Sequence, residues 1–114
     1  MKLVSKKYKI PMYFDYLVIV QDKDDKKIAK KYGLEGTETF DGCFFTKHSK
    51  DGHTKYVIAF FGKASPSAIA HEAVHVVNQI FKDRYIKLDI DNDEPQAYLL
   101  GWVVEKCHET LKLK

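Results

Sequence analysis

The segment SPSAIAHEAVHVVNQIFK, residues 65–82, carries the clearest structural signal in the chain. Ser65 and Pro66 are a typical N-cap and first-turn pair, and no glycine or proline follows within the segment, so we expect a helix here. At about 100° per residue, the apolar side chains fill one arc of this helix, and His71 and His75 lie on the opposite face. The segment therefore predicts an amphipathic helix with two histidines on its polar side.

The rest of the chain predicts a small sheet before this helix and a second long helix after it. Strands are expected at residues 13–21, 40–47 and 55–61, a short helix at 22–32, a connection at 83–92 with an extended piece at 85–90, and a last helix at 94–111. The Asp51-Gly52 pair is a turn signal, so the second and third strands should form an antiparallel hairpin. This order predicts an α+β fold, in which a small mixed or antiparallel sheet packs against helices.

Composition sets limits on the class of protein. The 114 residues are 45% apolar and 31% charged, which fits a single domain over residues 1–114. The net charge of +3 is too mild to indicate nucleic acid as a partner. No apolar run approaches the roughly 18–20 residues that span a bilayer, and no export signal is evident, so we expect a cytoplasmic protein with no membrane partner. In that compartment Cys43 and Cys107 should stay reduced, and the alternative is one disulfide between them.

The sequence His71-Glu72-Ala73-Val74-His75 matches the H-E-x-x-H motif. Two histidines four positions apart project from the same face of a helix, so both imidazoles can bind one zinc ion. The carboxylate of Glu72 is offset by about 100°, which places it beside the metal as a general base. The plainer alternative is that both histidines are ordinary surface residues and that Glu72 is solvated.

A catalytic zinc site needs a third protein ligand. Asn78 and Phe81 stand where the longer H-E-x-x-H-x-x-G-x-x-H motif has glycine and histidine, so that subclass is excluded. The third ligand is expected from the next helix. Glu94 opens that helix and shares a polar stripe with Tyr98 and Glu105, and Glu105 is the alternative ligand.

His71-Glu72-x-x-His75 followed by Glu94 resembles the gluzincin zinc metallopeptidases, and in particular their minimal single-domain members. The resemblance implies one zinc ion per chain, held by His71, His75 and Glu94, with Glu72 as the general base in hydrolysis of a peptide or protein substrate. Tyr98 departs from the family pattern, which has an acid there. It is our candidate donor to the oxyanion, with His108 as the second.

In this family an extended peptide adds to an edge strand above the metal helix, and residues 55–61 are the nearest candidate strand in sequence. The alternative function is a non-catalytic, zinc-containing binding or regulatory module, such as those encoded by phages and mobile elements. The run Asp89-x-Asp91-x-Asp93 begins like an EF-hand, but Glu94 and Leu100 stand at the positions that require glycine and glutamate, so calcium is not expected.

Overall fold

A computed structural model describes residues 3–35 and 42–111 and shows a small α+β fold, as the sequence predicts. The elements are β1 (Val4–Lys9), β2 (Tyr16–Asp22), α1 (Asp25–Tyr32), β3 (Gly42–His48), β4 (Thr54–Phe61), α2 (Pro66–Asp83), the 3-10 helix η2 (Ile90–Asn92) and α3 (Glu94–Leu111). The extended piece expected at 85–90 does not form a strand. No helix in the described residues is both long and apolar enough to span a bilayer.

The four strands form one mixed sheet in the order β1-β2-β4-β3. The predicted β3–β4 hairpin is confirmed, and Gly52 takes a positive φ of 88° in its turn. Strand β4 also pairs in parallel with β2, so it lies inside the sheet. The expectation that residues 55–61 offer a free edge is therefore wrong, and β3 is the edge strand on that side.

Strand β1 is absent from the sequence prediction, which has no element before residue 13. Half of its six residues are lysines, so it lacks the apolar alternation that signals a strand. It forms because β2 offers it an antiparallel partner along its whole length. The phenol of Tyr8 also shares a 2.8 Å hydrogen bond with the hydroxyl of Thr110 on α3. A local sequence pattern carries no information about these long-range contacts.

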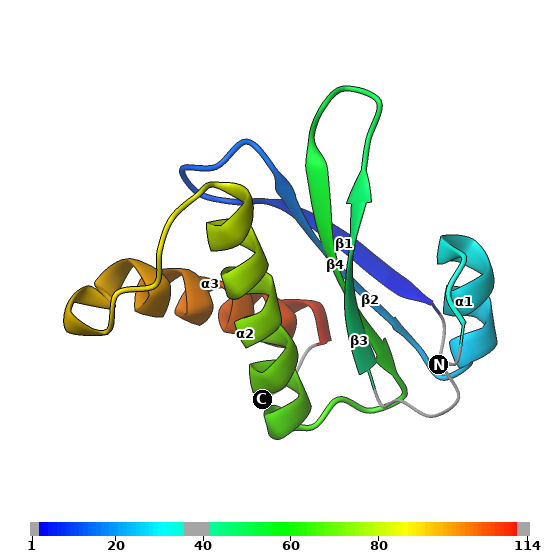
Figure 1. The fold of residues 1–114 in the computed structure, drawn as a ribbon. Coiled ribbons are helices and arrows are strands. Elements are labelled where there is room, and N and C mark those ends of the chain that lie inside the picture. Colours follow the sequence, from blue (N-terminus) through cyan, green and yellow to red (C-terminus); the bar gives the residue numbers. More distant parts are fainter. Residues whose placement is uncertain (1–2, 36–41, 112–114) are drawn as a thin grey trace.

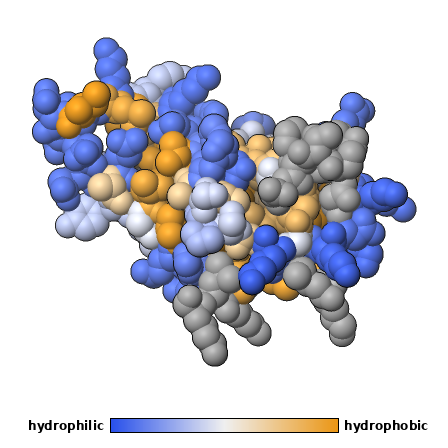
Figure 2. Space-filling view, turned by 90° about the horizontal axis from the view of Figure 1, so that it is seen from below, coloured by the Kyte–Doolittle hydropathy of each residue, from blue (hydrophilic) through white to orange (hydrophobic). Residues whose placement is uncertain are grey.

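The two faces of the sheet are covered unequally. Helices α2 and α3 pack on one face over the main core, and α1 covers part of the other face (Figure 1). Side chains alternate accordingly: Leu17 and Ile58 point toward α2 and α3, whereas Val18 and Val57 point to the face of α1. The view from below shows apolar residues exposed on the left, the side to which α2 and α3 belong (Figure 2).

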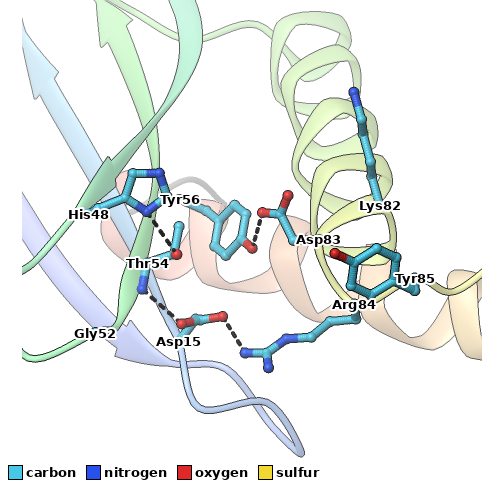
Figure 3. A pocket seen from close by; sticks show the side chains of 9 residues that line it. All are labelled: Asp15, His48, Gly52, Thr54, Tyr56, Lys82, Asp83, Arg84 and Tyr85. Atoms are coloured by element: carbon cyan, nitrogen blue, oxygen red, sulfur yellow. Dashed lines mark hydrogen bonds and ion pairs between the residues drawn. The ribbon is translucent and has the colours of Figure 1, made fainter.

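Polar contacts hold the last turn of α2 against the sheet (Figure 3). The Tyr56 hydroxyl donates a 2.6 Å hydrogen bond to Asp83. The buried Asp15 carboxylate accepts the Thr54 amide at 2.8 Å and forms an ion pair with Arg84. At the other end, the Ser65 hydroxyl accepts the Ala68 amide at 3.1 Å and caps the helix, as predicted. The C-terminal end of α2 is thus tied to the sheet, and its N-terminal end is capped within its own first turn.

Candidate metal centre

His71 and His75 project together from the second and third turns of α2, as predicted. Their Nε2 atoms lie 3.2 Å apart, and the two rings meet edge to face with centroids 4.8 Å apart. Two nitrogens that bind one zinc ion tetrahedrally, at 2.0–2.1 Å each, lie about 3.3 Å from one another. The two imidazoles are therefore spaced as a shared metal ion requires, and a hydrogen bond between them has the same length.

Glu72 completes a compact cluster with these histidines. One ligand atom from each of His71, Glu72 and His75 lies within 4.8 Å of the others, and together these residues could hold a metal ion. We call them the histidine cluster. Glu72 is only 7% exposed, whereas both histidines are exposed. Burial raises the pKa of the Glu72 carboxyl, and the charges of His71 and His75 act in the opposite direction.

Strand β3 forms the far wall of the site. Gly42, Cys43 and Phe44 line one open cavity of about 310 Å³ together with the histidine cluster. A Cβ atom at Gly42 would lie 2.9 Å from the carbonyl oxygen of Ala59, so the close approach of β3 to β4 requires glycine there. This wall has no signal in the sequence beyond the predicted hairpin, which ends beside α2.

The structure does not bring Glu94 into the histidine cluster. Glu94 and Tyr98 line a separate cavity of about 630 Å³ with Pro11, Leu99 and Trp102. Helix α3 passes behind α2 and starts on the side of α2 away from β3 (Figure 1). Tyr98 is 76% exposed, and it does not line the cavity of the histidine cluster.

The amphipathic pattern of α3 explains why Glu94 lies away from the histidine cluster. Leu99, Val103 and Cys107 are buried and pack into the core that α2 shares. Glu94 lies on the opposite side of the helical wheel from these residues, so a helix that buries them turns Glu94 away. Glu105 is exposed beside Lys106, at 3.6 Å, and is not part of the cluster either.

Two further histidines, His48 and His53, and the acidic run that begins at Asp89 have local roles. His48 shares a 3.2 Å hydrogen bond with the Thr54 hydroxyl across the hairpin (Figure 3). His53 packs edge-on against Tyr16, with ring centroids 5.5 Å apart. The Asp89 carboxylate accepts the amide of Asp91 at 3.0 Å and caps η2. Within the described residues, the histidine cluster is the one group of three or more potential metal ligands.

The two cysteines are free in the structure. Cys107 is buried in the main core, and Cys43 is half-buried on the face of the sheet that carries α1. Burial raises the pKa of Cys107 to about 12 and that of Cys43 to about 11, and the charge of Glu72 adds to the shift at Cys43. Neither thiol is therefore poised as a nucleophile at neutral pH.

Comparison of the chain with protein-family models, curated proteins and solved structures finds no match.

Proposed function

We propose that the chain is a zinc-dependent metallopeptidase in which His71 and His75 bind the metal and Glu72 is the general base. The observation that carries this proposal is the 3.2 Å separation of the two Nε2 atoms beside a buried carboxylate. Neutral imidazole nitrogens are ligands that suit zinc well. A solvated surface pair of histidines has no need of a buried carboxylate next to it, so the plainer alternative explains less.

Bound zinc would polarise a substrate carbonyl and lower the pKa of a water molecule. Glu72 would accept the proton of the attacking water and deliver it to the leaving amine. Its partial burial suits this role, because a carboxylate with a raised pKa is a stronger base than a solvated one. The exposed histidines leave the site open to a substrate.

The edge strand β3 is the surface against which we expect an extended peptide to bind. It borders the cavity of the histidine cluster, and it pairs with β4 on one side. The backbone groups on the other side of an edge strand can hydrogen-bond to an added strand. Phe44 lies on the cavity side of β3 and packs parallel to Tyr56, which gives the wall an apolar surface. We therefore propose β3, and not residues 55–61, as the strand that a substrate peptide pairs with.

One observation favours the alternative of a non-catalytic, zinc-containing binding module. Within residues 3–35 and 42–111, the cluster has two histidines and one carboxylate, and Glu94 is elsewhere. A catalytic zinc ion needs a third protein ligand, and in these ranges Glu72 is the one candidate beside the two histidines. If Glu72 is that ligand, it cannot serve as the base. The two proposals therefore differ in what Glu72 does.

Measurement of bound zinc and of peptidase activity in matched variants distinguishes the peptidase from the binding module. We expect about one zinc ion per chain in the wild type and in Glu72→Gln, with activity on unstructured peptides lost only in the variant. His71→Ala and His75→Ala should lose both zinc and activity, and the control His53→Ala, whose ring packs against Tyr16, should lose neither. Loss of zinc in Glu72→Gln would instead support the binding module. A wild-type chain that binds no zinc would contradict both.

A further inference from the structure

The sheet face opposite the histidine cluster carries another cavity, of about 320 Å³. Four lysines line it, each from a different element: Lys7 of β1, Lys31 of α1, Lys47 of β3 and Lys55 of β4. Its remaining lining residues are Ser5, Val18, Tyr32 and Val57. We call this the lysine cavity. Four elements that are separate in sequence thus place a positive charge around one hollow.

The strand register explains how the lysines converge. Lys7 pairs with Val18, and Val18 pairs with Val57, so these three side chains share one row across the sheet. In the neighbouring row, Lys55 pairs directly with Lys47. Two like charges on directly opposed residues of antiparallel strands destabilise a sheet. This pair therefore has a cost that a bound anion would remove.

Aromatic rings hold three of the four lysines at the cavity. The ammonium of Lys7 lies 4.6 Å from the ring centroid of Tyr16. Those of Lys31 and Lys47 lie 5.5 and 5.4 Å from the ring of Tyr32. These cation–π contacts keep the ammonium groups near the sheet and do not neutralise their charge.

Carboxylates do not balance this charge in the described part of the chain. The ion pairs found there involve Arg84 and Lys106, and none includes a lysine of the cavity. The phenol of Tyr32 and the hydroxyl of Ser5 add two groups that can donate to an anion. The floor, by contrast, consists of the buried side chains of Val18 and Val57.

We propose that the lysine cavity binds a small phosphate ester with at least two negative charges, of the nucleoside diphosphate class. Lysine ammonium groups are common phosphate ligands, and the apolar floor and Tyr32 suit a flat ring. The charges surround one cavity of ligand size, whereas a nucleic-acid strand is bound along an extended track. This site is on the other face of the sheet from the histidine cluster and does not depend on the proposed peptidase activity.

Calorimetric titration of the metal-free protein with ADP, inorganic pyrophosphate and adenosine tests the proposal. We expect ADP and pyrophosphate to bind, with affinity falling as salt rises, and adenosine to bind much more weakly. Lys47→Met and Lys55→Met should each weaken ADP binding on the order of tenfold. The control Lys87→Met, at an exposed position between α2 and α3, should leave it unchanged.

Stability without ligand provides a second readout. Because Lys47 and Lys55 repel each other, either variant should melt at the same temperature as the wild type or higher when no anion is present. Equal ADP affinity in the wild type and in both folded variants would overturn the proposal. So would binding of a single-stranded oligothymidylate by a protein that binds neither ADP nor pyrophosphate, since the surface would then be a nucleic-acid site.

Discussion

Replacing Glu72 by glutamine should make the metal-free protein more stable. Glu72 is 7% exposed as a residue, burial raises the pKa of its carboxyl, and among the described residues no ion pair to it is formed. A buried charge without a partner destabilises a fold, and glutamine has nearly the same shape without the charge. A residue that is retained for function often lowers stability, so its replacement is expected to stabilise the fold.

The surroundings of Glu72 also set the size of the expected gain in stability. A fully desolvated ion would cost several kcal/mol, but the carboxylate borders an open cavity and two histidines lie within 4.8 Å. We therefore expect a gain of about 1 kcal/mol in the free energy of unfolding, or about 4 °C in Tm for a domain of this size.

Urea denaturation and thermal melting at neutral pH with a chelator measure this gain. The matched control is Glu105→Gln, because the Glu105 side chain is 65% exposed and its loss should change stability by less than about 0.5 kcal/mol. A Glu72→Gln variant that is less stable than the wild type would refute the reasoning, since it would mean that the carboxylate has a stabilising partner.

Three further outcomes follow from the contacts described above. Tyr56→Phe removes the hydroxyl that donates to Asp83, and we expect a loss of about 1–2 kcal/mol in urea denaturation; an unchanged midpoint would contradict this. Above pH 9 the free energy of unfolding should fall by up to about 1.4 kcal/mol per pH unit. The cause is Cys107, because its pKa is raised from 9.0 to about 12 in the folded state and the unfolded chain therefore loses this proton first. The variant Cys107→Ala should show a shallower pH dependence. Glu94→Gln should keep its bound zinc, and loss of zinc in this variant would restore Glu94 as a ligand.

Much of the architecture was predictable from local patterns. The N-cap at Ser65 and the unbroken amphipathic run after it predict α2, and the Asp51-Gly52 turn predicts the β3–β4 hairpin. These signals are local, because capping and turn conformations depend on residues a few positions apart. Strand β1 was missed for the same reason: its lysine-rich sequence has no strand pattern, and only pairing with β2 makes it a strand.

The candidate site likewise has a part that local sequence predicts and a part that depends on tertiary packing. The sequence alone determined that His71 and His75 share a helix face and that Glu72 stands beside them, because the period of the α-helix sets those positions. Only the tertiary structure decided which elements face the cluster. Helix α3 buries Leu99 and Val103, and this packing directs Glu94 to another cavity. Side-chain positions within one helix follow from its geometry, whereas the neighbours of that helix depend on how all the apolar faces of the chain are buried together.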